Sequence, residues 1–294
     1  MTYLRSLLFA PANHARHAER ALSGAADGVI LDLEDAVAVA EKPAARAAAR
    51  QLLESRAAPH PRVYVRINAL STPFAYDDLH SVICAGLDGL VVPKVEAPEQ
   101  VAIVDWFLGQ LERERAIPAG SIEIVPIIET AAGLLRAQQI AAASPRLKRL
   151  SFGAGDFSLD TNMTWTVGHE GLLWARIQMV IISRAARLAP PLDTVFADLA
   201  DIEGLAAEAA QAKRLGFGGK TCIHPKQAEL VNALFTPSAE EVEQAQRIVD
   251  TFEQAVASGI ASLQVAGQFV DYPVAEKARR IVELGASIER RRTN

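Results

Sequence analysis

The sequence is poor in cysteine and histidine and has no long apolar run. Two cysteines, Cys84 and Cys222, and six histidines occur in 294 residues. Two isolated cysteines cannot build a disulfide framework, and without a CxxC or HxxxH pair a zinc site is not expected. No stretch approaches the roughly 20 apolar residues that a membrane helix needs, and the chain leads directly into YLRSLLFAP without a signal-peptide pattern. We therefore expect a cytoplasmic protein with reduced thiols and no membrane partner.

Strong positive charge and nucleotide-binding loops are also missing. The net charge is -5, the pI is about 5.8, and the RRR run at residues 290–292 is short. This composition argues against a general nucleic-acid partner. The sequence has no Walker motif, and no GxGxxG follows the first predicted strand. A nucleotide hydrolase or a dinucleotide dehydrogenase is therefore not expected.

Half of the residues are apolar, and short apolar runs recur along the chain. Eight of them are predicted to be strands, at residues 6–10, 28–34, 62–68, 89–95, 122–129, 149–156, 191–196 and 219–225. Alanine-rich amphipathic stretches separate them, as is typical of helices. Apolar strands alternating with helices indicate a parallel sheet covered on both faces, and eight such units match a (β/α)8 TIM barrel. An open, doubly wound sheet is the alternative, because periodicity cannot show closure.

The pattern changes after residue 225. SAEE at residues 238–241 has a serine followed three residues later by a glutamate, which is a capping box that opens a helix to about Ser258. A weak strand or loop and a last helix follow. We expect a catalytic barrel over residues 1–225 and a C-terminal helical extension, or lid, over residues 226–294.

Polar side chains collect where the predicted strands end, which is where barrel enzymes place their chemistry. They are Asp32, Glu34, Asp35, Arg66, Asn68, Lys94, Glu129, Asp156 and His224. Any one of them could be an ordinary solvated strand end, but the set together indicates a site. Glu129 and Asp156 follow adjacent strands, and two hard oxygen ligands with open positions suit Mg²⁺, with Mn²⁺ as the alternative. For His224, a hydrogen bond within the barrel mouth is favoured over metal ligation.

Seven motifs occur in a fixed order over nearly the whole chain: RSLLFAP, GVILDLEDAV followed by EKPAAR, VYVRIN, VPKVE, PIIET, FGAGDFSLD and GKTCIHPKQ. Together they resemble the citrate lyase beta-subunit-like branch of the HpcH/HpaI aldolase superfamily, which includes malyl-CoA and citramalyl-CoA lyases. The resemblance implies a (β/α)8 barrel, dependence on Mg²⁺, and cleavage of a 3-hydroxyacyl-CoA thioester to acetyl-CoA and a 2-oxo acid. It also implies a homotrimer or hexamer in which the C-terminal lid covers a neighbour's active site.

The resemblance also implies roles for individual residues. Glu129 and Asp156 match the metal ligands, and Glu129 would also contact the substrate. Arg66 matches the arginine that binds the substrate and takes part in catalysis. GQFVDYP matches a GxxVDxP segment, which makes Asp271 the expected catalytic acid/base, delivered from the neighbouring subunit.

The DLED segment has a supporting role in this resemblance. Asp32 and Asp35 would border the water shell of the metal. Glu34 and Lys42 would organise the loop through ion pairs. Direct catalysis is not expected of the three acids.

Several motifs depart from the family pattern. LFAPANH replaces LxVPG, Gly155 stands where an acid or polar residue is frequent, and DYPV lacks a histidine after the proline. These changes indicate a shifted substrate preference, for which citramalyl-CoA is the first choice, followed by malyl-CoA and citryl-CoA. Three alternatives stay open: a citrate lyase beta subunit that acts with partner subunits on a citryl carrier-protein thioester, an aldolase of free 4-hydroxy-2-oxo acids, and a non-enzymatic ligand sensor.

Overall fold

The structure is a computed structural model that describes residues 3–56, 61–166 and 170–293. Its contacts separate the chain into two compact units, one covering residues 4–233 and the other residues 234–293 together with Tyr3. A buried apolar core lies in each unit. Among the residues described, no helix is both long and apolar enough to cross a membrane.

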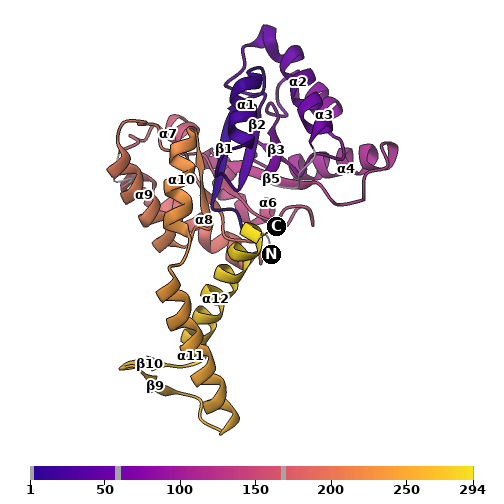
Figure 1. The fold of residues 1–294 in the computed structure, drawn as a ribbon. Coiled ribbons are helices and arrows are strands. Elements are labelled where there is room, and N and C mark those ends of the chain that lie inside the picture. The colour runs from indigo at the N-terminus through magenta and orange to yellow at the C-terminus, as the bar shows by residue number, and fades with distance from the viewer. Residues whose placement is uncertain (1–2, 57–60, 167–169, 294) are drawn as a thin grey trace. The chain divides into compact units, whose positions relative to one another are not determined.

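Eight parallel strands of the larger unit close into a barrel in sequence order (Figure 1). The strands are β1 (Ser6–Pro11), β2 (Gly28–Asp32), β3 (Arg62–Arg66), β4 (Gly89–Val92), β5 (Glu123–Ile128), β6 (Ser151–Phe152), β7 (Leu192–Asp193) and β8 (Gly219–Cys222). Closure is seen in the pairing of β8 with β1, where Leu7 lies opposite Thr221. The predicted (β/α)8 barrel is confirmed, and the open doubly wound alternative is wrong.

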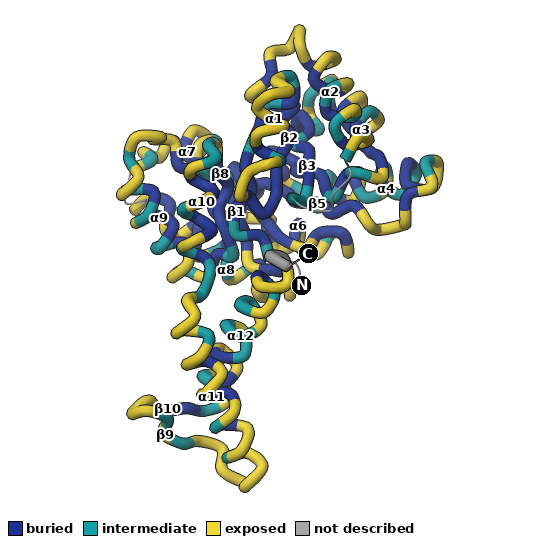
Figure 2. Tube along the Cα trace, in the orientation of Figure 1, coloured by how far each residue is buried: buried dark blue, intermediate teal, exposed yellow. Residues whose placement is uncertain are grey.

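Helices cover the outside of the barrel. They are α1 (Ala15–Leu22), α2 (Lys42–Ser55), α3 (Ala75–Val82), α4 (Pro98–Glu114), α5 (Ala131–Leu135), α6 (Ala137–Ala141), α7 (Ala154–Thr161), α8 (Leu173–Ala185), α9 (Ile202–Leu215) and α10 (Pro225–Phe235), with 3-10 turns η1 (Val39–Glu41) and η2 (Glu170–Leu172). In α2, a stripe at Ala45, Ala49 and Leu53 is buried, while the other side is exposed (Figure 2). This spacing of four residues places the three side chains on one face of the helix.

Local signals set the ends of these helices. Asp201 caps α9 by accepting a hydrogen bond from the Gly204 amide at 2.8 Å. At the other end, Gly216 takes a φ of 104°, a left-handed conformation that favours glycine and stops the helix. Such caps supply partners for the terminal amides and carbonyls that the helix leaves free.

The lower end of the barrel, where the strands begin, contains a paired ionic cluster. We call it the floor cluster, and its members are Arg56, Arg62, Tyr64, Asp88, Glu123 and Arg149. Glu123 accepts hydrogen bonds from Arg149 at 2.9 Å and from the Tyr64 hydroxyl at 3.0 Å. Burial, followed by the charge of Glu123, raises the pKa of Tyr64, so the phenol stays protonated and donates. The ring of Tyr64 also joins the apolar side chains that fill the barrel.

The smaller unit is built from two helices and a hairpin. In α11 (Ala239–Ala257), the Ser238 hydroxyl accepts from the Glu241 amide and the Glu241 carboxylate accepts from the Ser238 amide, so the predicted capping box is confirmed. The expected weak strand or loop is a two-stranded hairpin, β9 (Leu263–Val265) and β10 (Gln268–Val270), followed by α12 (Tyr272–Thr293). Ala266 and Gly267 both have positive φ, as two-residue hairpin turns require.

The boundary by contacts falls after Ala233, whereas the expected extension begins at residue 226. The first residues of that extension form most of α10, which is the last helix of the barrel layer. There, the Ser6 hydroxyl donates to Asn232 at 2.8 Å, and the Asn232 amide donates to the Ala25 carbonyl at 2.6 Å. These polar contacts join α10 to β1 and to the segment before β2.

Candidate active site at the mouth of the barrel

The parallel register brings the ends of β1, β2 and β3 to one level, with Pro11 opposite Asp32 and Asp32 opposite Arg66. Asp32 is 2% exposed. Its carboxylate accepts from Arg66 Nε at 2.7 Å and Nη2 at 2.6 Å, and from the amides of Glu34 and Ala36 at 2.9 and 3.2 Å. Asp32 therefore holds both the arginine and the start of the following loop.

Arg66 is enclosed on its other sides as well. Its Nη1 lies 3.0 Å from Glu34 and 3.7 Å from Asp35, and its guanidinium lies 4.8 Å from the centre of the Phe9 ring. Burial alone would lower the pKa of Arg66, but the Asp32 bonds and the acidic neighbours outweigh burial and raise the pKa above its ordinary value, so the cation is permanent. The bidentate bond to Asp32 also fixes the plane of the guanidinium.

Lys94 connects the carboxylates of the mouth. Its ammonium lies 2.7 Å from Glu34 Oε1 and 3.5 Å from Asp156 Oδ2. Its backbone amide donates to Glu129 Oε1 at 2.7 Å. Glu129 and Asp156, the two expected metal ligands, therefore contact opposite ends of one residue. We call Asp32, Glu34, Asp35, Arg66, Lys94, Glu129 and Asp156 the mouth cluster.

The GAGD segment after β6 is shaped to fit Glu129. A Cβ at Gly153 would collide with Oε2 and Cβ of Glu129, so a glycine is required for this close approach. The next amide, that of Ala154, donates to the Thr194 hydroxyl at 3.0 Å. These contacts fix the start of α7, whose first turn carries Asp156. Gly153 therefore serves the packing of the site's own carboxylate.

The carboxylates fit a divalent cation. Burial raises the pKa of Glu129 to about 8, and the negative charges of Asp156 and Glu34 add to this effect. A hard cation would relieve the mutual repulsion of these oxygens, which are the donors that Mg²⁺ prefers. Across the residues that the structure describes, no group of three or more His, Cys, Asp or Glu side chains is placed to hold an ion. Two carboxylates would therefore share the ion with water and substrate oxygens.

The loop that carries Glu34 is held by a second set of contacts. The Lys42 ammonium donates to the carbonyls of Leu33 and Glu34 at 2.7 and 2.9 Å, and the Asn68 amide donates to the Leu33 carbonyl at 2.9 Å. Lys42 thus organises the loop through carbonyl oxygens, where we expected an ion pair. Asp35 is exposed at the rim, with a side chain 63% accessible. Its position differs from that of Asp32, which is buried.

Two further predicted residues, His224 and Asp271, make local hydrogen bonds. His224 is half-buried, and its Nδ1 accepts the Lys226 amide at 3.2 Å. Asp271 belongs to the smaller unit and caps α12, where its Oδ1 accepts the Val274 amide at 3.2 Å. Its catalytic role stays a prediction. Sequence reasoning missed Phe9 and Thr194. Phe9 lies in the RSLLFAP motif and Thr194 in a predicted strand, but only the contacts with Arg66 and Ala154 show that they belong to the site.

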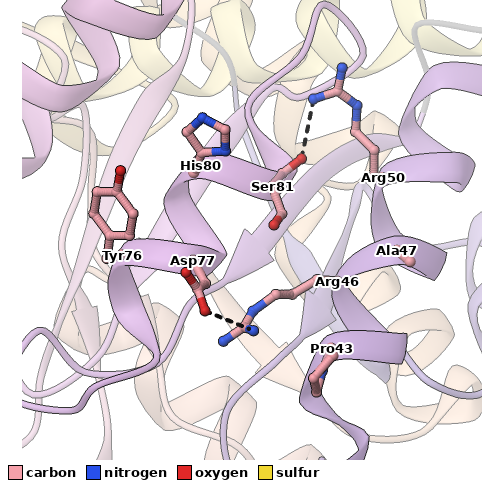
Figure 3. Close-up of a pocket in the computed structure, with 8 residues that line it drawn as sticks. All are labelled: Pro43, Arg46, Ala47, Arg50, Tyr76, Asp77, His80 and Ser81. Carbon is pink, nitrogen blue, oxygen red and sulfur yellow. Dashed lines mark hydrogen bonds and ion pairs between the residues drawn. The ribbon is translucent and has the colours of Figure 1, made fainter.

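Two cavities on the larger unit differ in their relation to the mouth. One of about 620 Å³ lies between β1, α1 and the start of α10, and its lining includes Phe9, His17, Arg20, His224 and Lys226. The other, of about 580 Å³, lies between α2 and α3 (Figure 3). There, Arg46 is bound to Asp77 and Asp78, and Arg50 to Glu54 and to carbonyls, so both arginines already serve the packing of the two helices.

Comparison with known proteins identifies the family. The model of the "HpcH/HpaI aldolase/citrate lyase" family matches residues 5–225, and a model named "C-C_Bond_Lyase of the TIM-Barrel fold" matches residues 178–283. The citrate lyase subunit beta of Leuconostoc mesenteroides is 34% identical, covering 95% of this chain and 92% of the relative. An L-malyl-CoA/beta-methylmalyl-CoA lyase of Rhodobacter capsulatus is 36% identical, covering 95% and 93%.

A solved structure resembles the chain over nearly its whole length. Protein CitE of Mycobacterium tuberculosis, in complex with magnesium, acetoacetate and coenzyme A, is 30% identical. It matches with a TM-score of 0.77 and covers 97% of this chain and 99% of its own.

Proposed function

The chain belongs to the HpcH/HpaI aldolase/citrate lyase family, and we propose that it is an Mg²⁺-dependent carbon–carbon lyase acting on a 3-hydroxyacyl-CoA thioester. The products would be acetyl-CoA and a 2-oxo acid. The observation that carries the proposal is the convergence of Glu129, Asp156 and Arg66 at the barrel mouth, linked through Lys94 and Glu34. Citramalyl-CoA, which would give pyruvate, is our first choice of substrate, followed by malyl-CoA and citryl-CoA.

Glu129 and Asp156 would hold the metal, with Mn²⁺ as a substitute for Mg²⁺. When bound, the ion supplies a Lewis acid that lowers the pKa of the substrate hydroxyl and offsets charge on the forming 2-oxo acid. Glu129 would also contact the substrate. The burial of Glu129, which is 4% exposed, supports this role because it excludes competing water.

Arg66 would bind the substrate and stabilise its negative oxygens during bond cleavage. Its guanidinium is held in one orientation by Asp32 and by the Phe9 ring before any substrate arrives. A charge that is already oriented needs no reorganisation in the transition state, which is how fixed dipoles and cations contribute most to catalysis.

Asp271 would complete the reaction. As the acid/base, the Asp271 carboxylate would accept the proton of the substrate hydroxyl while the carbon–carbon bond breaks and its electron pair stays on the thioester carbon as an enolate. Return of that proton from Asp271 to the carbon would yield acetyl-CoA. We propose that Asp271 comes from the neighbouring subunit of a homotrimer or hexamer, an assignment supported by the match of GQFVDYP to the family segment.

The cavity beside β1 is suited to the carrier end of the thioester. Its lining includes Phe9, whose ring contacts Arg66, so the cavity adjoins the mouth. His17, Arg20 and Lys226 provide cationic or hydrogen-bonding groups for phosphate. The alternative function is that of a citrate lyase beta subunit acting on a carrier-protein thioester, citryl-ACP to acetyl-ACP and oxaloacetate. The similarity to citrate lyase beta subunits supports this alternative and would require partner subunits.

The proposal is tested by incubating the purified protein and Mg²⁺ separately with citramalyl-CoA, malyl-CoA, citryl-CoA, a citryl carrier protein and a free 4-hydroxy-2-oxo acid. Acetyl thioester and 2-oxo acid are quantified. Glu129→Gln is expected to lose about 1000-fold or more in kcat/KM, since a metal contributes several kcal/mol to such reactions. Asp271→Asn is expected to lose about 100-fold to 10,000-fold in kcat with Mg²⁺ binding unchanged.

The outcomes separate the candidate functions. Cleavage of one CoA thioester that EDTA and Glu129→Gln abolish would support the proposal and identify the acyl group. Cleavage of the carrier-protein thioester alone would move the assignment to a citrate lyase subunit. Cleavage of the free oxo acid alone would reassign the protein as a CoA-independent aldolase. Metal binding without turnover of any compound would support the ligand sensor.

A further inference from the structure

Lys94 has an unusual backbone conformation at the centre of the mouth cluster. It follows β4 by two residues, and its φ is 52°, in the left-handed region that side chains other than glycine and asparagine rarely adopt. Such a conformation persists only when surrounding contacts compensate for it, and it is most common at functional sites. The contacts of Lys94 show what this conformation achieves.

The left-handed turn directs the two ends of Lys94 to different carboxylates. Its amide donates to Glu129 Oε1 at 2.7 Å, while its ammonium lies 2.7 Å from Glu34 Oε1 and 3.5 Å from Asp156 Oδ2. The ammonium is therefore held mainly by Glu34 and reaches Asp156 only loosely. Its side chain is 36% exposed, so it faces the open mouth and is not sealed in the core.

The charges around Lys94 are unbalanced. The mouth cluster contains five carboxylates and two cations, and Arg66 is committed to Asp32 by two hydrogen bonds. Lys94 is thus the cation that offsets Asp156. A positive charge at this place also repels an incoming metal ion, because a neighbouring unit charge is only partly screened at a half-buried site.

We propose that Lys94 is a positioning residue with two separable roles, an inference that rests on the metal assignment of the proposed function. Its ammonium serves as an internal counter-ion for both Glu34 and Asp156 before the metal binds, and it lowers the affinity of the site for Mg²⁺. Its backbone amide holds Glu129 in place. Binding of Mg²⁺ would displace only the long contact to Asp156, while the bond to Glu34 stays.

The test measures the Mg²⁺ dissociation constant of the full chain by isothermal titration calorimetry, which needs no substrate. Lys94→Met removes the charge and keeps the bulk, and Lys94→Gly removes the charge, relieves the left-handed conformation and keeps the amide. Both are expected to bind Mg²⁺ more tightly by about tenfold, the scale of one partly screened charge. Lys94→Arg keeps the charge and is expected to bind like the wild type.

The two ways of failing are distinguishable. Equal or weaker affinity in both Lys94→Met and Lys94→Gly, beside clear binding by the wild type, would overturn the counter-ion role and leave the metal site intact. No binding by the wild type, or binding that Glu129→Gln and Asp156→Asn leave unchanged, would overturn the metal assignment and this inference with it. Thermal melts of each variant check folding, and Lys94→Gly keeps the test valid if Lys94→Met proves unstable.

Discussion

The two ends of the barrel use similar side chains for different purposes. In the floor cluster, Glu123 is bound by Arg149, Arg62 and the Tyr64 hydroxyl, and Asp88 is bound by two arginines and a backbone amide. Three arginines serve two carboxylates there. In the mouth cluster, two cations face five carboxylates.

The charges of the floor cluster stabilise the fold, whereas those of the mouth cluster are suited to binding a ligand. A buried carboxylate with full partners loses those partners when it is mutated, which is costly. A buried carboxylate among like charges is itself a cost, and the fold tolerates it where a bound cation will offset it. Glu123 and Glu129 illustrate the two cases, because Glu123 begins β5 and Glu129 directly follows its last residue.

The sharpest test of the comparison makes the same substitution at both ends of β5. Glu123→Gln is expected to lower the free energy of unfolding by about 3 kcal/mol, because Arg149 and Arg62 lose a buried counter-charge. Glu129→Gln is expected to leave it unchanged or raise it, because it removes an acid whose ionisation is disfavoured by burial. Urea unfolding without added metal, followed by circular dichroism, measures both; equal losses would contradict the distinction.

Within the mouth cluster, Asp32 resembles the carboxylates of the floor cluster, because Arg66 donates to both of its oxygens. Asp32→Asn is expected to lower kcat/KM by about 10-fold to 100-fold, since one charge-assisted hydrogen-bond partner of Arg66 is worth about 1.5–3 kcal/mol. Asp35→Asn, at an exposed neighbour, is the matched control and should change kcat/KM little. Steady-state kinetics on the substrate found active gives kcat and KM separately. Similar losses in both variants would contradict the assignment of Asp32 as the holder of Arg66.

The smallest effect concerns a paired acid outside both clusters, Glu112 on α4. Burial alone would raise its pKa, but the hydrogen bond from Arg146 and the amides of Gly120 and Ile122 lower it below the ordinary value. Because the folded-state pKa is lowered, its contribution to stability is present above the unfolded-state pKa and disappears as the pH falls through the folded-state value.

The corresponding measurement is the free energy of unfolding between about pH 3 and pH 6, around the ordinary glutamate pKa. The wild type is expected to lose stability as the pH falls below about 4.5, and Glu112→Gln to show a flatter dependence over that range. A parallel slope in the two proteins would show that Arg146 does not act on Glu112 in this way.

The fold was largely predictable from local pattern. All eight strands lie within or next to the predicted runs, and the capping box at Ser238 begins a helix as expected. The errors are systematic, because several runs were predicted too long at their C-terminal ends. Residues 33–34 and 93–95 fall in the predicted runs but leave the sheet to form the mouth. Strand propensity does not distinguish a strand end from a functional loop.

The family and the residues of the mouth were also accessible from motifs, and membership of the family is confirmed by the comparisons. The contacts of those residues were not accessible from the sequence. Lys42 donates to carbonyl oxygens, Asp32 accepts hydrogen bonds from Arg66, and Lys94 adopts a left-handed conformation. Each depends on the distance between residues that lie 8 to 60 positions apart in the chain.

The sequence by itself determined the order of strands and helices, because burial of apolar side chains is a periodic, short-range pattern. It also determined which ionisable groups stand at the strand ends. Only the tertiary structure decided how those groups are paired, since the strength of an ionic contact depends on separation and on exclusion of water. Closure of the barrel set both the separation of the groups and their exclusion from water. As a result Glu123, at the start of β5, is hydrogen-bonded to Arg149 and Tyr64, whereas Glu129, just after its end, lies among other carboxylates.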